Sequence, residues 1–185
     1  MAHILLGVSG GIAAYKAADL VSQLVKAGHT VRVMMTPSAT RFVGPLTFEA
    51  MSGHPVMTDA LAQAGTGSLS AVEHIEWAKW ADLAVVAPAT ANTLARMAHG
   101  FAEDAVSTVL LALPSGTPLL ICPAMNTQMW AHPLVTRNLQ ILGELPHVSV
   151  VEPVAKRLAC GDVGVGGLAE VVDIVGAIHQ QLERS

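Results

Sequence analysis

Short apolar runs alternate with stretches of helical periodicity along the chain. Five apolar runs are bounded by turn residues and are predicted to be buried strands: residues 3–8, 30–35, 83–87, 117–122 and 148–151. Between the first two, apolar side chains recur at helical spacing over residues 12–27, and Gly28 ends that helix. Strand, glycine turn, helix and strand in this order predict an α/β fold with a doubly wound, flavodoxin-like (Rossmann-like) parallel sheet.

The other segments follow the pattern less regularly. A short helix is expected after Pro45, and longer ones at residues 74–80, 92–98, 103–113, 133–142 and 169–182. Residues 53–56 are interpreted as a turn. Residues 61–72 are small and polar without a period, which favours a mobile loop that could lie over a site. The glycine-rich residues 158–167 favour a flexible flap.

Length and composition indicate one domain, residues 1–185, that assembles with copies of itself. A chain of 185 residues can bury a full core. Hydrophobic residues make up 52% and charged residues only 13%. Such a charge-poor surface predicts buried subunit interfaces, hence a homo-oligomer.

Charge and cysteine content exclude several classes of function. Ten Lys and Arg against 14 Asp and Glu give a net charge of −4, which argues against a nucleic-acid partner. The uncharged stretch 105–125 is long enough to span a membrane, but the turn at residues 114–118 breaks it, so no membrane partner is expected. The chain opens on a short strand rather than a signal peptide. Two cysteines form no disulfide framework, which favours the cytoplasm.

A glycine turn follows the first strand and predicts a phosphate site. Ser9, Gly10, Gly11 and Ile12 open the first helix, but the turn is neither GxGxxG nor a Walker motif. The second strand ends in residues 36–38, Thr-Pro-Ser, without the acidic residue that would hold a dinucleotide ribose. Hydroxyls and helix N–H groups suit a phosphate monoester, which favours FMN over NAD. A plain strand-to-helix turn is the alternative.

The string Pro-Ala-Met-Asn-Thr-Gln-Met-Trp, residues 123–130, lies between the fourth strand and a helix that begins near Thr127. Asn126 therefore lies at the carboxyl edge of the sheet, where open α/β sheets bind ligands. Its amide can donate and accept hydrogen bonds, and Met125 and Met129 add apolar surface suited to a flat ring. The alternative is an Asn that only caps the helix.

This string resembles the PxMNxxMW motif of the flavin-dependent cysteine decarboxylases. Three further segments are similar to motifs of that family: residues 74–82 around His74, residues 88–93, and the flap at residues 159–166 around Cys160. The flap is closest to that of the phosphopantothenoylcysteine decarboxylases. The resemblance implies FMN contacts at Ser9, Gly10, Gly11, Ile12, Thr36, Ser38, Phe42, Ala89, Thr90, Ala91, Thr93 and Met125.

The resemblance also implies catalytic roles. His74 would be the base that assists thiol oxidation, Asn126 would bind the substrate carboxylate, with Met129 beside it, and Cys160 would donate the final proton. His99 is an alternative base. Relatives often carry Arg at the position of Gly167, so Lys156 or Arg157 is expected to substitute for it. No metal site is expected.

The reaction implied is FMN-dependent decarboxylation of 4′-phosphopantothenoyl-L-cysteine to 4′-phosphopantetheine, a step of coenzyme A synthesis. Two alternatives stay open: a decarboxylase of peptide C-terminal cysteines, and a flavin-binding regulatory subunit. Relatives assemble as trimers or as dodecamers of trimers. Whether the chain acts alone or as half of a bifunctional decarboxylase–synthetase is open.

Overall fold

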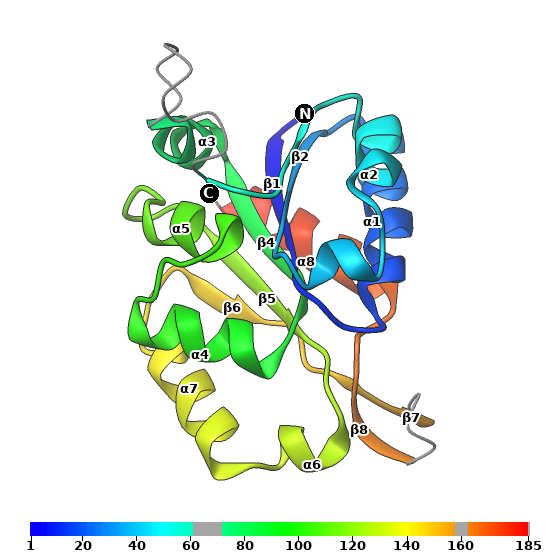
Figure 1. The fold of residues 1–185 in the computed structure, drawn as a ribbon, viewed down its shortest axis with the longest axis vertical. Helices are drawn as coiled ribbons and strands as arrows, with labels where there is room; N and C mark the ends of the chain where they lie inside the picture. Colours follow the sequence, from blue (N-terminus) through cyan, green and yellow to red (C-terminus); the bar gives the residue numbers. More distant parts are fainter. Residues whose placement is uncertain (61–71, 158–162, 185) are drawn as a thin grey trace.

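The computed structural model describes residues 1–60, 72–157 and 163–184. Its centre is a six-stranded parallel sheet in the order β3-β2-β1-β4-β5-β6 (Figure 1). The strands are β1 (His3–Val8), β2 (Thr30–Met35), β3 (Val56–Met57), β4 (Leu83–Ala89), β5 (Leu119–Pro123) and β6 (Val148–Val150). This is the strand order of doubly wound Rossmann-like sheets, and the predicted fold class is confirmed.

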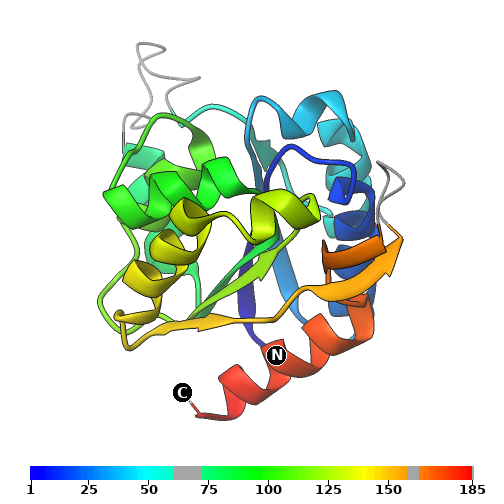
Figure 2. The same ribbon diagram turned by 90° about the horizontal axis from the view of Figure 1, so that it is seen from below.

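Helices cover both faces of the sheet (Figures 1 and 2). One face carries α1 (Ala14–Lys26), α2 (Pro45–Ser52) and α8 (Val171–Arg184). The other carries α3 (Glu73–Trp80), α4 (Ala91–His99), α5 (Ala105–Leu111) and α7 (Pro133–Gly143). The short η1 (Ala39–Arg41) and α6 (Thr127–Trp130) lie in the connections after β2 and β5.

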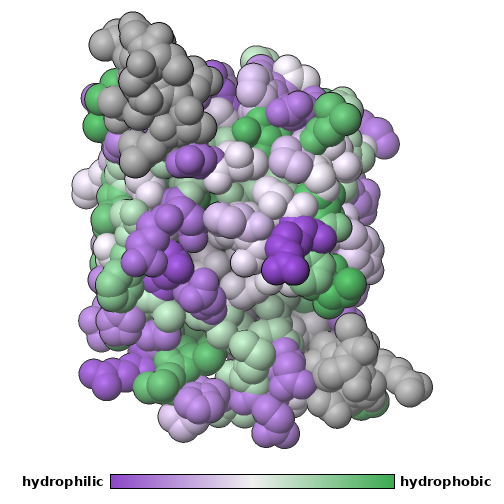
Figure 3. Space-filling model, viewed as in Figure 1, coloured by the Kyte–Doolittle hydropathy of each residue, from purple (hydrophilic) through white to green (hydrophobic). Residues whose placement is uncertain are grey.

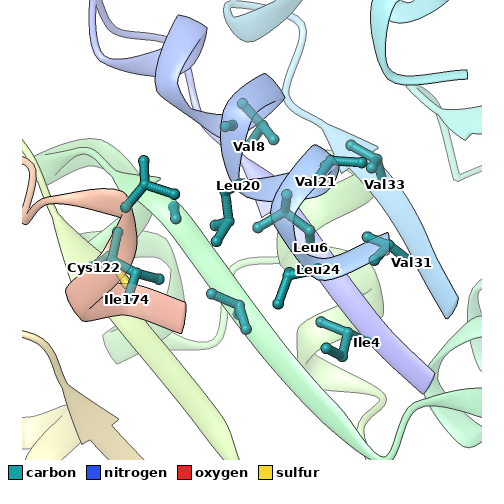
Figure 4. Close-up of a cluster of buried hydrophobic side chains, with 14 of the residues drawn as sticks. Ile4, Leu6, Val8, Leu20, Val21, Leu24, Val31, Val33, Cys122 and Ile174 are labelled. Carbon is teal, nitrogen blue, oxygen red and sulfur yellow. The ribbon is translucent and has the colours of Figure 1, made fainter. Parts of the chain in front are cut away.

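Alternation along the central strands builds one hydrophobic cluster on each face. In β1, Ile4, Leu6 and Val8 point toward α1 and α8, whereas Leu5 points to the opposite face. Figure 4 shows the first cluster, with Leu20 and Leu24 of α1 packed on the strands. Because both faces are covered, the central strands β4 and β5 are apolar throughout instead of alternating with polar residues.

Cys122 belongs to the same cluster. Its side chain is fully buried in β5, and burial raises the pKa of its thiol well above the ordinary range. This agrees with its interpretation as a small hydrophobic residue.

A second, two-stranded sheet stands beside the carboxyl edge of the main sheet. β7 (Val154–Arg157) pairs antiparallel with β8 (Val163–Gly167), forming the hairpin seen at the lower right of Figure 1. The part of the predicted flap that the structure describes is therefore a hydrogen-bonded strand. Its glycines have little strand propensity of their own, and the backbone of the preceding strand β7 supplies the pairing.

Other boundaries differ modestly from the sequence-based expectation. Val56 was expected in a turn, but Val56 and Met57 form the edge strand β3 on β2. Asp104, expected within the first turn of α5, is instead its N-cap, with a capping box to Ser107. The predicted mobile loop lies, apart from Val72, outside the described residues. No helix in the described part of the chain has the length and apolar character needed to span a membrane.

Candidate active site

The loops after β1 and β4 meet where the winding of the sheet reverses. β1 and β4 are neighbours, but the chain continues from them to opposite faces. The Ser9 hydroxyl ties the two loops together: it donates to the Pro88 carbonyl at 2.7 Å and accepts from the Thr90 backbone N–H at 3.0 Å. Ligands of open α/β sheets bind at this reversal point.

A cavity of about 610 Å³, here called the main cavity, opens at this edge. Figure 2 views the edge from below, with the loop after β1, α4, α6 and the β7–β8 hairpin around it. The walls of the main cavity are mostly apolar and come from segments far apart in the sequence. The lining residues are Gly10, Gly11, Ile12, Ala13, Tyr15, Lys16, Pro88, Thr90, Ala91, Asn92, Ala124, Met125, Asn126, Met129, Lys156, Gly166, Gly167 and Leu168.

A second cavity of about 300 Å³, here called the polar cavity, adjoins the first and shares Gly10, Thr90 and Asn92 with it. Hydroxyl and charged side chains dominate its lining, which consists of Gly10, Thr36, Pro37, Ser38, Thr90, Asn92, Thr93, Arg96, Glu103 and Asp104. Arg96 forms ion pairs with Glu103 at 2.8 Å and with Asp104 at 3.7 Å. The two cavities together offer an apolar chamber joined to a polar one.

Gly10 brings the first loop against the end of β2. A Cβ added there would overlap the Ser38 Cβ and lie 2.7 Å from the Ser38 carbonyl carbon. Only a residue without a side chain lets the two loops approach this closely. The predicted glycine turn is thus a close contact between two cavity-lining loops.

Asn126 is the N-cap of α6. Its Oδ1 accepts from the backbone N–H of Gln128 at 2.7 Å and of Met129 at 3.4 Å. The side-chain oxygen of Asn126 therefore caps the helix, as the alternative interpretation predicted. The residue also lines the main cavity. Cap and ligand contact are compatible, because the amide has separate donor and acceptor atoms.

The hairpin is joined to this motif through backbone contacts. The Met125 N–H donates to the Gly166 carbonyl at 2.8 Å. Gly166 has a φ of +143°, and a Cβ there would overlap the Met125 carbonyl oxygen. Glycine is needed at this position for both its backbone conformation and its lack of a side chain.

Lys16, Lys156 and Glu170 form a charged cluster at the hairpin side of the main cavity. Glu170 accepts from Lys16 Nζ at 2.9 Å and lies 3.8 Å from Lys156 Nζ. The hydrogen bond and charge of Lys16, then the charge of Lys156, lower the pKa of Glu170. Burial disfavours the charge of Lys16, but Glu170 raises the Lys16 pKa overall. Burial and the neighbouring Lys16 lower the pKa of Lys156.

Most of the predicted ligand contacts line one of the two cavities. The main cavity brings together Gly10, Gly11, Ile12, Thr90, Ala91, Met125, Asn126 and Met129, and the polar cavity brings together Gly10, Thr36, Ser38, Thr90 and Thr93. Ser9 and Ala89 are fully buried behind these walls. Phe42 is half exposed and lines neither cavity.

Sequence reasoning missed Asn92 and Lys16 as lining residues. Asn92 lies within the quoted loop 88–93, so its motif position was an available signal. Lys16 follows Ile12 by four residues, about one turn of the predicted helix. The spacing therefore indicated that both residues lie on the same face of that helix. The lining by Gly166 and Leu168 depends on the hairpin, for which the local sequence gave no sign.

His74 lies far from both cavities. It belongs to α3, which precedes β4 and lies at the amino end of the sheet, whereas α6 and the hairpin lie at the carboxyl end (Figure 1). The seven residues of β4 separate these ends by about 20 Å. The His74 Nδ1 is buried and has no hydrogen-bond partner among the described residues. One chain therefore does not bring His74 to Asn126.

His99, the alternative base, and His132, which lies near α6 in the sequence, have structural roles. The His99 Nε2 contacts Asn138 Oδ1 at 3.2 Å, and the His132 Nδ1 accepts from the Leu134 N–H as the N-cap of α7. No histidine is among the described residues that line the main cavity. Cys160 lies outside the described residues, in the segment that joins β7 to β8.

Sequence comparison places this site in a known family. Residues 1–183 match the Flavoprotein family. The chain belongs to that family. A probable phosphopantothenoylcysteine decarboxylase of Streptococcus mutans is 46% identical to this flavoprotein over 179 residues, 97% of this chain and 98% of that protein. The coenzyme A biosynthesis bifunctional protein CoaBC of Bacillus subtilis is 49% identical over 173 residues, 94% of this chain but only 41% of that protein.

Solved structures agree with the sequence matches. A PPC decarboxylase mutant complexed with pantothenoylaminoethenethiol has a TM-score of 0.88 and 33% identity to this flavoprotein, covering 98% of both chains. The FMN binding protein AtHal3 has a TM-score of 0.86 and 34% identity, covering 100% of this chain and 98% of that one. The predicted membership of the flavin-dependent cysteine decarboxylases is confirmed.

Proposed function

We propose that the protein binds FMN and decarboxylates 4′-phosphopantothenoyl-L-cysteine to 4′-phosphopantetheine in coenzyme A synthesis. One observation carries this proposal: the loops after β1, β4 and β5 and the β7–β8 hairpin converge on one cavity, although they are far apart in the sequence. The loops after β4 and β5 and the described part of the flap resemble decarboxylase motifs, whereas the fourth such segment, around His74, lies at the other end of the sheet. The similarity to the Streptococcus mutans protein over almost all of both chains supports the same activity. The bifunctional relatives are more than twice as long, so the proposal covers only the decarboxylase step.

The two cavities suit the two chemical parts of FMN. Thr36, Ser38 and Thr93 offer hydroxyls in the polar cavity for the ribityl chain and phosphate, next to the start of α4. Met125, Ile12 and the apolar walls of the main cavity suit a flat ring. Its volume of about 610 Å³ is within the usual range of cofactor and ligand sites. Bound FMN supplies the two-electron acceptor that lets the cysteine Cβ–S unit be oxidised, after which the adjacent carboxylate can leave as CO2.

The protein's own residues bind the substrate and handle its protons. Asn126 lines the main cavity, and its amide nitrogen is a hydrogen-bond donor, which suits the substrate carboxylate. Met129 lines the same wall. His74 serves as the base, the role that the motif around it implies. Cys160 serves as the final proton donor, and the cavity-lining strand β8 follows its segment.

The position of His74 supports a homo-oligomer in which one copy completes the site of another. Within one copy, His74 and Asn126 lie at opposite ends of the sheet. Both can act in one site only if the amino end of the sheet in one copy packs against the main cavity of another. Ile12 and Tyr15, which line the main cavity, and Leu134 of α7 are each about three-fifths exposed. Figure 3, in the view of Figure 1, shows hydrophobic residues in the region of α7. Trimers, or dodecamers built of trimers, are the proposed assemblies, and the cytoplasm is the proposed compartment.

The test is to incubate the purified protein with 4′-phosphopantothenoyl-L-cysteine and, separately, with a peptide ending in cysteine, and to measure the product masses. Decarboxylation of the small molecule to the saturated thiol supports the proposal. Conversion of the peptide alone, stopping at its enethiol, would instead favour the peptide decarboxylase. A preparation that shows no flavin absorbance after FMN titration and acts on neither would refute both.

A further inference from the structure

The main cavity has one positively charged end. Of its described lining residues only Lys16, from α1, and Lys156, from β7, carry charge. Their side chains are 16% and 33% exposed, whereas the Glu170 carboxylate between them is 56% exposed. Two ammonium groups and one carboxylate leave a net positive charge at an otherwise apolar wall.

Gly167 determines where the Lys156 side chain lies. A Cβ on Gly167 would overlap the Lys156 Cε and come within 2.8 Å of its Cγ and 2.9 Å of its Cδ. The aliphatic part of Lys156 therefore occupies the space that any other residue at 167 would fill. Its Nζ donates to the Leu168 carbonyl at 3.1 Å, which holds the ammonium at the rim of the cavity.

The cluster has one more positive charge than negative charge. The carboxylate of Glu170 is shared by two cations, and it lies 2.9 Å from one but 3.8 Å from the other. Burial and Lys16 lower the pKa of Lys156, so its ammonium is stabilised by any added anion. Because Glu170 is largely exposed, its carboxylate can turn toward water when a stronger anion arrives.

We propose that Lys156, lying across Gly167, acts with Lys16 as an anion-recognition site that selects substrates bearing a phosphate monoester over analogues without one. A phosphate monoester carries a charge of about −1.5 to −2 at neutral pH and matches two ammonium groups better than one carboxylate does. The proposal rests on the proposed decarboxylase function, to which it adds a substrate-selecting residue. A peptide substrate without phosphate gains nothing from this cluster.

The first test compares 4′-phosphopantothenoyl-L-cysteine with its dephosphorylated analogue, pantothenoyl-L-cysteine, as substrates of the FMN-loaded protein. Lys156→Gln is expected to lower the preference for the phosphorylated substrate about tenfold or more, through KM rather than kcat. Its loss of activity on the analogue should be much smaller than its loss on the phosphorylated substrate. Lys156→Arg keeps the charge and should retain most of the preference, and Lys26→Gln, an equal charge change on an exposed residue at the end of α1, should retain all of it.

Gly167 provides a second and independent test. Gly167→Ala displaces the Lys156 side chain, so it should lower the same preference, and it should add little in a Lys156→Gln background. If Gly167 is only a structural glycine, the two substitutions will act additively and Gly167→Ala will affect both substrates equally.

Binding of 4′-phosphopantothenate and of pantothenate, measured by calorimetry, separates this inference from the proposed function. If neither substrate is decarboxylated but Lys156→Gln still weakens 4′-phosphopantothenate binding, the proposed reaction is wrong and the anion site stands. An unchanged phosphate preference in Lys156→Gln overturns the inference. So does a loss of FMN with the preference unchanged, because the lysines would then hold the cofactor phosphate.

Discussion

At the scale of single residues, the two glycines of the first loop are not equivalent. A Cβ on Gly10 would overlap Ser38, whereas a Cβ on Gly11 would meet the Thr90 Cγ2 at an ordinary contact distance of 3.6 Å. Gly10 lines both cavities, so its contact with Ser38 fixes the wall that they share.

We expect Gly10→Ala to destabilise the protein by about 1–3 kcal/mol, because the added methyl group must displace backbone as well as a side chain. FMN retention should fall with it. Gly11→Ala is the matched control for stability, which should stay close to that of the wild type. Thermal unfolding and flavin absorbance after gel filtration measure the two effects, and equal losses of stability in both variants would contradict the steric explanation.

Cys160 is predicted to supply the last proton, and serine is a much weaker acid than a thiol, whose ordinary pKa is about 8.5. Cys160→Ser should therefore still oxidise the substrate and release CO2, but stop at the enethiol. Mass spectrometry of the product measures this. A cysteine that only packs in its loop predicts the saturated thiol at a somewhat lower rate, and that product would remove Cys160 from the reaction.

At the scale of the secondary-structure elements, the residue that caps α6 also has a proposed chemical role. The helix has four residues, and Asn126 caps it. Asn126→Asp keeps an oxygen for the cap but replaces the amide donor by a negative charge, and Asn126→Ala removes both functions.

We expect Asn126→Ala to cost about 1 kcal/mol of stability through the lost cap, and Asn126→Asp to cost about half of that or less. Activity should fall about 100-fold or more in Asn126→Asp, because two carboxylates repel each other. Chemical unfolding and kcat/KM, measured on both variants, separate the roles. Near-normal activity of Asn126→Asp would show that Asn126 is only a cap.

Helix α8 is joined to the start of β2 by two histidines. The Nε2 atoms of His29 and His179 are 3.2 Å apart, and the rings are 5.3 Å apart. Burial, the charge of His179 and the amino terminus lower the pKa of His29. The unfolded chain therefore binds this proton more readily than the folded protein does.

This lowered pKa predicts a stability loss in acid. The contribution of His29 is fully present above its unfolded pKa of about 6.5 and is lost as pH falls through the folded pKa. Between about pH 7.5 and pH 5.5, Tm should therefore fall more in the wild type than in His29→Gln. His54→Gln, in the turn between α2 and β3, is the control and should follow the wild type. Parallel pH curves for all three proteins would exclude His29.

At the scale of the whole molecule, the two proposed catalytic residues lie at opposite ends of the sheet. His74 lies at the amino end and Asn126 at the carboxyl end. The proposed assembly joins His74 of one copy to the main cavity of another.

Mixing two inactive variants tests this arrangement. His74→Asn and Asn126→Asp should each be inactive alone, but mixed oligomers should regain activity, with intact residues in about a quarter of the sites. The variants are to be co-expressed, and native mass spectrometry is to confirm that mixed oligomers form. Mixing His74→Asn with His74→Gln is the control and should recover nothing. Mixed oligomers without activity would contradict a shared site.

The same scales separate what the sequence alone determined from what required the tertiary structure. Apolar runs and helical spacing were enough to predict five of the six sheet strands and the doubly wound class, because those signals come from residues close together in the chain. Motif strings likewise predicted the Gly10, Thr90 and Asn126 loops, and strand polarity brought these to one edge of the sheet.

Contacts between distant segments could not be predicted in this way. The glycine-rich strand β8 forms only because β7 pairs with it, and Lys156 has its position only because Gly167 lies beneath it. The separation of His74 from the main cavity likewise depends on the length and order of the strands. Local sequence encodes which elements form, whereas the surroundings of each side chain are set by chain segments that approach it only in the folded protein.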